Sequence, residues 1–347
     1  MPDIYTLTKN YLALRDAIEN HPDLDSLLLL QPSVRELEEY LDTDFQRDYE
    51  ADERGELPAD FPRALISQDG LYNLLCENDR LLRELAMEKH TVPTNAEIIK
   101  IAMAQSAIDL NCSPDDFTVS ENKVVISAPN PDAHRYLSLP FALNLLSYGS
   151  NIVASVSPEL KQVARDYINK YPVEHCFETP NLHALDDALA PYGYKTCFMA
   201  EYFLPDVNAL LLHPCKYQTK MLTQPDFKNL YTPEWSNALC ERRRHLDVLG
   251  IGAYDGDKLI GLAACSADAR DMWQIGIDVL PDYCRQGIAS ALTSALAYEI
   301  LNRGKVPFYC AAWSNIKSVR NALKCGFKPA WVELTAKPAA TVNEMNK

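Results

Sequence analysis

No apolar run in this 347-residue chain approaches the roughly 18 to 20 residues that a membrane-spanning helix needs. The first residues, MPDIYTLTKNYLALRD, also lack the basic start and apolar middle of a signal peptide. We therefore expect a cytoplasmic protein with no membrane partner. Hydrophobic residues make up 47% of the chain, which argues against disorder and favours a globular protein with more than one domain.

The chain also lacks paired metal ligands and a basic surface pattern. Its ten cysteines form no CxxC pair, and no His cluster has metal-ligand spacing, so we expect buried thiols in a reducing compartment and no metal site. The net charge is -15, and most of the excess acid lies in residues 1–90. No basic stripe suits a nucleic acid, so we expect no such partner. The acidic surface is either a solvated face or an attraction for cationic substrates.

Three nucleotide-binding and hydrolase motifs are missing as well. Neither GxxxxGK[ST] nor GxSxG occurs, which argues against a P-loop enzyme and a serine hydrolase of the nucleophile-elbow type. The glycines of GIGAYDG at 250–256 are mis-spaced for GxGxxG, and a second strand is expected after them in place of a helix. A dinucleotide fold is therefore not indicated.

Residues 1–92 are predicted to form a helical N-terminal extension. Ser33 and Glu36 have the spacing of a capping box, which predicts a helix start at Ser33. Pro93 interrupts the helical pattern and marks the boundary. Nothing in this part indicates a chemical activity.

Residues 93–206 are predicted to form an α/β middle domain. Thr94 and Glu97 have the spacing of a second capping box, at the start of a helix. The β-branched runs at 123–127 and 151–156 predict strands, since branched side chains pack well on a pleated surface. A helix is expected at 157–168 and a further strand at 195–205.

Residues 207–337 carry the clearest pattern, and residues 338–347 are expected to be a tail. Gly256 lies in a turn that predicts a hairpin, and Pro281 ends a strand of alternating apolar residues. The expected elements are strands at 246–255, 258–267 and 272–280, a helix from 288, a strand at 307–313 and a helix at 314–326.

The loop between the strand at 272–280 and the following helix has the features of an anion cradle. Free backbone N–H groups gather at a helix start, and the small residues Gly287, Ala289 and Ser290 let a phosphate approach the main chain. Arg285 adds a charged donor. The several donors together are sufficient to hold a diphosphate.

At this loop the sequence resembles the GNAT acyl-CoA N-acyltransferase superfamily. The family loop has Arg or Gln, two variable residues, Gly, one variable residue, then Gly or Ala. In CRQGIA, Gly287 and Ala289 occupy the last two fixed positions, whereas Cys284 stands at the first. The resemblance extends from VLPDY to SNIKSVRNALKCGF and covers roughly the last 130 residues. It implies an α/β fold with a mixed, mostly antiparallel sheet flanked by helices, and the middle domain is then interpreted as a degenerate GNAT-like unit.

The resemblance also implies roles for individual residues. Backbone groups of Ile277 and Val279 would hold the pantetheine arm of coenzyme A and polarise the thioester carbonyl. Asn315 would bind the pantetheine, with Ser318 and Asn321 nearby on the same helix. The residues that would bind the diphosphate are Arg285, Gln286, Gly287, Ile288, Ala289 and Ser290.

The catalytic groups of the family are not all present. Many members have a tyrosine that protonates the departing thiolate, and Ala322 stands at that position here. Ser318, Tyr309 or water are alternatives, as is departure of the free thiolate. The position of the glutamate base found in some members holds Trp273 or Gln274. Other candidates for the base are Asp278, Glu201, Glu241 and His245, and we take Asp278 and Ser318 as the candidate catalytic residues.

These observations predict an N-acetyltransferase that uses acetyl-CoA as its co-substrate and needs no metal. Its acceptor would be an amine, which the acidic chain favours if the amine is cationic. The alternative is a non-catalytic protein that binds or senses acyl-CoA, with an N-terminal region that contacts a protein partner. A homodimer is left open.

Overall fold

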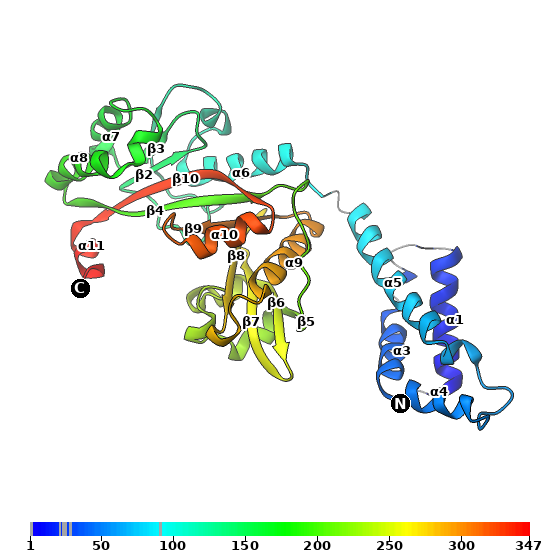
Figure 1. Cartoon of the computed structure of the whole chain (residues 1–347). Helices are drawn as coiled ribbons and strands as arrows, with labels where there is room; N and C mark the ends of the chain where they lie inside the picture. Colours follow the sequence, from blue (N-terminus) through cyan, green and yellow to red (C-terminus); the bar gives the residue numbers. More distant parts are fainter. Residues whose placement is uncertain (1–2, 21, 23–25, 28–29, 90–91) are drawn as a thin grey trace. The chain divides into compact units, whose positions relative to one another are not determined.

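The structure is a computed structural model, and it describes residues 3–20, 22, 26–27, 30–89 and 92–347. The chain divides into two compact units, Met1–Val92 and Pro93–Lys347 (Figure 1).

The first unit consists of helices around a leucine-rich core. Leu14, Leu37, Leu65 and Leu71 are completely buried there. Its helix α3 begins at Gln31, so the predicted start at Ser33 is wrong: Pro32 already occupies the first turn, where its missing N–H costs nothing. The described elements are α1 (Ile4–Asn20), α3 (Gln31–Thr43), α4 (Phe45–Glu53), η1 (Arg63–Ile66) and α5 (Gln68–Lys89).

The second unit contains one sheet of ten described strands. Their order is β1-β3-β2-β10-β4-β9-β8-β7-β6-β5. Only β1–β3 and β8–β9 pair in parallel within the described part of the chain. The strands are β1 (Lys123–Ile126), β2 (Leu143–Ser147), β3 (Val153–Val156), β4 (Tyr194–Pro205), β5 (Gln218–Thr223), β6 (Asp247–Asp255), β7 (Lys258–Ser266), β8 (Met272–Val279), β9 (Val306–Ala311) and β10 (Phe327–Pro338).

Helices cover both faces of this sheet. Figure 1 shows α9 and α10 on one side of β4 and β10, and α6 on the other. The helices are α6 (Asn95–Leu110), α7 (Lys161–Ile168), α8 (Thr179–Leu189), α9 (Ile288–Asn302), α10 (Ile316–Lys324) and α11 (Ala339–Met345). The short 3-10 helices η2 to η9 lie between these elements. The predicted class, a mixed and mostly antiparallel sheet flanked by helices after a helical N-terminal region, is confirmed.

The sheet is continuous through the predicted middle and C-terminal domains. Strand β4 lies between β9 and β10, so a strand from before residue 206 is hydrogen-bonded on both sides to strands from after it. The division at residue 206 stays a prediction. Three strands, β2, β5 and β10, were not predicted, and the tail from residue 338 contains the helix α11.

The capping box at the start of α6 is present as predicted. The Thr94 side chain accepts from the Glu97 N–H, and the Glu97 carboxylate accepts from the Thr94 N–H at 2.8 Å. We expect Thr94→Ala to lower the free energy of unfolding by about 1 kcal/mol, because the Glu97 N–H loses its side-chain acceptor. Urea denaturation of the wild type and the variant measures this, and an unchanged midpoint would contradict it.

A carboxyl group is buried on the α6 face of the sheet. Glu333 on β10 accepts from the Trp331 indole N–H at 2.9 Å. Burial raises the pKa of Glu333 to about 7, and the charge of Asp109 on α6 adds to this, whereas the Trp331 hydrogen bond, His134 and Asn144 act against it. Asp109 is itself held by His134, whose Nδ1 lies 2.6 Å from its carboxylate.

This buried carboxyl makes stability depend on pH. A folded-state pKa of about 7, against an ordinary value of 4.5, means that the folded state holds the proton more tightly. The free energy of unfolding should therefore fall as pH rises from about 4.5 to 7, by an amount on the order of 3 kcal/mol. Urea denaturation at several pH values should show this slope in the wild type and in the exposed control Glu121→Gln, and a flatter one in Glu333→Gln. Equal slopes in all three proteins would refute it.

Within the described residues, no helix has both the length and the apolar character that crossing a bilayer requires. No group of three or more His, Cys, Asp or Glu side chains among them is arranged to hold a metal ion.

Candidate functional site

The junction between β8 and α9 contains two residues with left-handed backbone. Arg285 has a φ of 62° and Gly287 a φ of 84°. Gly287 is the N-cap of α9, and no side chain caps this helix end. The first helical bond runs from the Ala291 N–H to the Gly287 carbonyl, so the N–H groups of residues 288–290 have no carbonyl partner in the helix. A Cβ atom at Gly287 would meet nothing within 4 Å, so the space above these donors is open.

A cavity of about 300 Å³ lies at this junction. The loop and the first turn of α9 form one wall, through residues 284, 285 and 287–290. Helix α10 supplies Lys317, Arg320 and Lys324 to the lining. With Arg285, four cationic side chains border the exposed N–H groups, although the whole chain is strongly acidic. Exposed charges farther away than about 8 Å are largely screened in salt, so the local donors decide what binds here.

The three lysine and arginine residues of α10 were missed by the sequence reasoning. Their positions 317, 320 and 324 have the spacing of one helical face, and this signal was readable from the sequence. The predicted site residues at this helix are Asn315, Ser318 and Asn321.

Hydrogen bonds fix the two walls of the cavity to each other. The Ser290 hydroxyl donates to the side-chain oxygen of Asn321 at 3.1 Å, and the side-chain NH₂ of Asn321 donates to the Thr293 hydroxyl at 3.0 Å. Ile288 is 2% exposed and packs over Gly261 of β7, so its side chain anchors the helix start in the core. Gln286 does not line the cavity, and its side chain accepts from the Tyr217 hydroxyl at 2.9 Å.

Strands β8 and β9 separate beside the cavity. Their parallel pairing ends at Gln274 and Phe308. Beyond it, β8 continues to pair with β7 up to Val279, whereas residues 309–311 of β9 pair with β4. The Leu280 N–H donates to the Ile260 carbonyl on the β7 side.

Successive residues of a strand direct their backbone groups to opposite edges. Because Leu280 directs its N–H toward β7, the N–H and C=O groups of Ile277 and Val279 point away from β7, into this opening. Val279 also lines the cavity. The opening and the cavity are therefore connected at the end of β8.

The two candidate catalytic residues have partners of their own. The Asp278 carboxylate accepts from the Asn237 and Ala238 backbone N–H groups, each at 2.9 Å, and from the Asn237 amide at 2.7 Å. These contacts hold the loop at 237–238 against β8. Ser318 lies on the first turn of α10, and its N–H donates to the Asn315 side chain, which caps the helix. The catalytic roles of Asp278 and Ser318 stay predictions.

The other candidates lie in different surroundings. Gln274 donates to the Cys310 sulfur at 3.3 Å and so joins β8 to β9 where their pairing ends. Glu241 accepts from Arg244 at the surface. Glu201 on β4 lines a separate cavity, and burial raises the pKa of its carboxyl. Ala322 is completely buried.

Tyr309 is the first β9 residue beyond the last β8–β9 pair. It is 3% exposed, and burial raises the pKa of its phenol, while hydrogen bonds to Ser318 and Asn321 act in the opposite direction. At neutral pH the hydroxyl is therefore protonated and able to donate.

Comparisons with known proteins place the second unit in a family. Residues 152–330 match the model of the GNAT acetyltransferase family. Residues 4–87 match a domain of unknown function, DUF4298. No curated protein is similar enough to count as a match.

Solved structures of GNAT proteins are also similar, at low identity. A putative acetyltransferase from Novosphingobium aromaticivorans is 17% identical with a TM-score of 0.32, over 42% of this chain and 66% of its own. A GCN5-related N-acetyltransferase-like protein from Streptococcus suis is 20% identical with a TM-score of 0.34, over 45% and 69%. A GNAT acetyltransferase from Colwellia psychrerythraea is 15% identical with a TM-score of 0.35, over 53% and 76%.

The chain spans about two thirds of the first of these structures. The family model, in contrast, extends over the β8–α9 junction, the opening between β8 and β9, and helix α10. The chain belongs to the GNAT acetyltransferase family.

Proposed function

We propose that the chain transfers the acetyl group of acetyl-CoA to an amine by direct attack. The observation that carries the proposal is the cationic cavity at the β8–α9 junction, with unpartnered helix N–H groups at one side and the β8–β9 opening at the other. The diphosphate of coenzyme A suits the cavity, because a helix N-terminus and basic side chains both favour phosphate. The pantetheine arm then extends along Val279 and Ile277.

The reaction needs three contributions from the protein. The backbone groups of Ile277 and Val279 orient the thioester and polarise its carbonyl. The amine nitrogen, after losing a proton to a base, attacks the carbonyl carbon, so that a C–N bond forms and the C–S bond breaks. The leaving thiolate takes a proton, for which we propose the Tyr309 hydroxyl at the floor of the opening.

We expect Tyr309→Phe to lower kcat by about tenfold to a hundredfold. This loss is smaller than is typical for general acid catalysis, because water is a substitute donor. The KM for acetyl-CoA should change little, since the phenol does not line the diphosphate cavity. Steady-state release of free thiol measures both constants. The exposed Tyr192→Phe is the control, and an equal kcat in both variants would exclude Tyr309 as the acid.

Binding and turnover test the function itself. Acetyl-CoA should raise the melting temperature, and NAD should not, because it lacks the pantetheine arm and the 3′-phosphate. A panel of amines is then screened for thiol release above the hydrolysis background. The absence of a thermal shift at millimolar acetyl-CoA would contradict the proposal.

A second function is favoured by one observation. Many members of the family have a tyrosine that acts as the general acid at the position of Ala322. Ala322 is fully buried in α10, so no hydroxyl group reaches the thioester from that position. The alternative is a protein that binds or senses acyl-CoA without transferring it, with residues 1–92 as an interaction region. A thermal shift without turnover of any amine would favour this alternative.

A further inference from the structure

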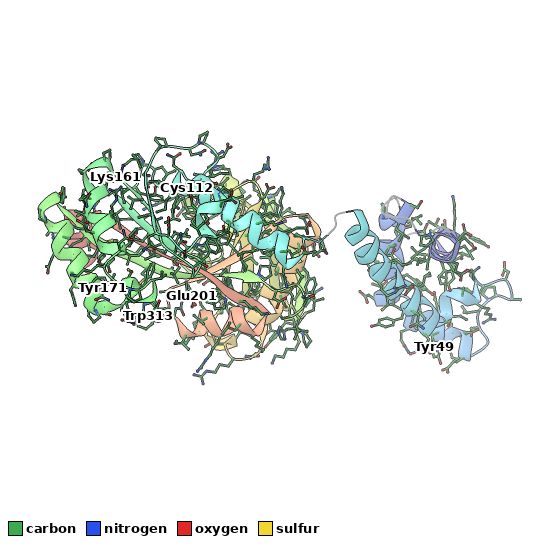
Figure 2. All side chains as sticks on the ribbon, turned by 90° about the horizontal axis from the view of Figure 1, so that it is seen from above. Tyr49, Cys112, Lys161, Tyr171, Glu201 and Trp313 are labelled. Carbon is green, nitrogen blue, oxygen red and sulfur yellow. The ribbon has the colours of Figure 1, made fainter. Side chains whose placement is uncertain are left out.

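A second cavity of about 520 Å³ lies between β4, the segment before α8 and the residue Trp313. Figure 2 labels two of its lining residues, Glu201 and Trp313. We call it the Glu201 cavity. Its volume lies within the range of pockets that bind small organic ligands. The apolar part of its lining consists of Phe177, Pro180, Met199, Ala200, Trp313 and Val332.

The lining of this cavity has acidic side chains and no basic ones. Its lining includes Glu178 and Glu201 but no Lys, Arg or His. Glu178 has a partner, since its carboxylate lies 3.9 Å from the His175 ring nitrogen. The Glu201 carboxylate has neither a hydrogen bond nor an ion pair among the described residues, and burial raises its pKa. A half-buried carboxylate without a partner is stabilised when a cation enters and pairs with it.

Trp313 adds a second cation-binding feature. Its side chain is 62% exposed, although it is one of the largest apolar groups of the chain. It lies two residues after the end of β9 and lines the same cavity as Glu201. An indole face attracts an ammonium group and also packs against an aromatic or aliphatic body.

The cavity borders the C-terminal end of β9, the strand that also borders the proposed pantetheine path. Glu201 is paired in register with Ala311, two residues before Trp313 and four before Asn315. Tyr309 and Ala311 are two residues apart, so their side chains lie on the same face of β9, and the side chains of paired strand residues also share a face. The Glu201 carboxylate and the Tyr309 phenol therefore lie on the same face of the sheet.

A neighbouring cavity of about 380 Å³ extends the available space. Phe177, Glu201 and Val332 line both cavities, so the two adjoin at these residues. A ligand whose ammonium group pairs with Glu201 thus has apolar surface on either side of it.

We propose that the Glu201 cavity binds the acceptor of the reaction, and that the acceptor is a primary amine with an aromatic or branched apolar body. The inference rests on the proposed acetyl transfer and assigns its second substrate. Glu201 pairs with the ammonium group, and Trp313, Met199 and Phe177 contact the apolar body. Small polar amines lose these apolar contacts and bind more weakly.

Calorimetry with three probes tests this inference on the full chain, with and without saturating coenzyme A. 2-Phenylethylamine has both required features, 2-phenylethanol lacks the charge, and methylamine lacks the apolar body. We expect 2-phenylethylamine to bind at least tenfold more tightly than the other two. The lost charge-assisted hydrogen bond accounts for the difference from 2-phenylethanol, and the lost burial of apolar surface accounts for the difference from methylamine. Equal affinities for 2-phenylethylamine and 2-phenylethanol, or no binding of the amine at millimolar concentration, would overturn the proposal.

Variants locate the binding. Glu201→Gln should weaken 2-phenylethylamine binding by about tenfold. Trp313→Ala, which truncates a side chain that is largely exposed, should weaken it by about fivefold. Glu159→Gln removes an exposed carboxylate elsewhere and should change nothing. Unchanged binding in both Glu201→Gln and Trp313→Ala refutes the site.

The two levels of the proposal fail in different ways. If amines are acetylated with acetyl-CoA, but the KM values for the amines are the same in the wild type, Glu201→Gln and Trp313→Ala, the cavity assignment is wrong and acetyl transfer stands. If the amine binds as predicted but acetyl-CoA neither binds nor turns over, acetyl transfer is wrong, and the cavity loses its role as the acceptor site.

Discussion

Gly287→Glu is expected to weaken acetyl-CoA binding by at least a hundredfold. The substitution places a carboxylate in the open space above the N–H groups of α9, where the proposed diphosphate binds. It also forces a side chain onto a backbone with a φ of 84°, at a cost of about 1 to 2 kcal/mol. Isothermal titration calorimetry with acetyl-CoA measures the affinity.

Gly193→Glu is a closely matched control for this experiment. Gly193 has a φ of 79°, and a Cβ atom there also meets nothing within 4 Å, so the control adds the same strain and the same charge before β4. Its affinity for acetyl-CoA should equal that of the wild type. If Gly287→Glu and Gly193→Glu bind equally well, the cradle lies elsewhere.

Among the variants proposed here, Gly276→Ala should cause the largest loss of stability, about 3 kcal/mol or more. A Cβ atom at this position would overlap the Asn237 carbonyl oxygen, which belongs to the main chain and has no side-chain rotation to relieve the clash. The loop cannot move aside without breaking the three hydrogen bonds that Asp278 accepts from Asn237 and Ala238. Urea denaturation measures the change in the free energy of unfolding.

Gly250→Ala is the comparison for this second variant. Its new methyl group would lie 2.9 Å from the Ala263 carbonyl oxygen, a milder conflict that a small shift relieves. We expect a clearly smaller loss of stability. If Gly276→Ala is no less stable than Gly250→Ala, the loop at 237–238 is not packed against β8 as described.

The elements around the β8–α9 junction could be predicted because their signals are local. The hairpin of β6 and β7 turns at Gly256, which has a φ of 58°, and the strand that Pro281 follows is β8. Strand β10 could not be predicted in the same way. It contains Pro329 and ends at Pro338, and its position depends on β2 and β4, which are more than a hundred residues distant in sequence.

The candidate site likewise has a part that local sequence predicts and a part that only the fold assembles. The cradle at Arg285–Ser290 is one continuous segment, so its residue types and spacing indicated it. The partners of Asp278 come from a loop about forty residues earlier, and no sequence pattern indicates that contact. The Glu201 cavity assembles segments around 178, 200, 313 and 332, which only the fold brings together.

The most direct test of the central claim is a crystal structure of the full chain with acetyl-CoA bound. We predict the diphosphate within hydrogen-bond distance of the N–H groups of residues 287–290, with Lys317 and Arg320 beside it, and the thioester between Ile277 and Tyr309. Coenzyme density at another position, with the β8–α9 junction unoccupied, would contradict the account.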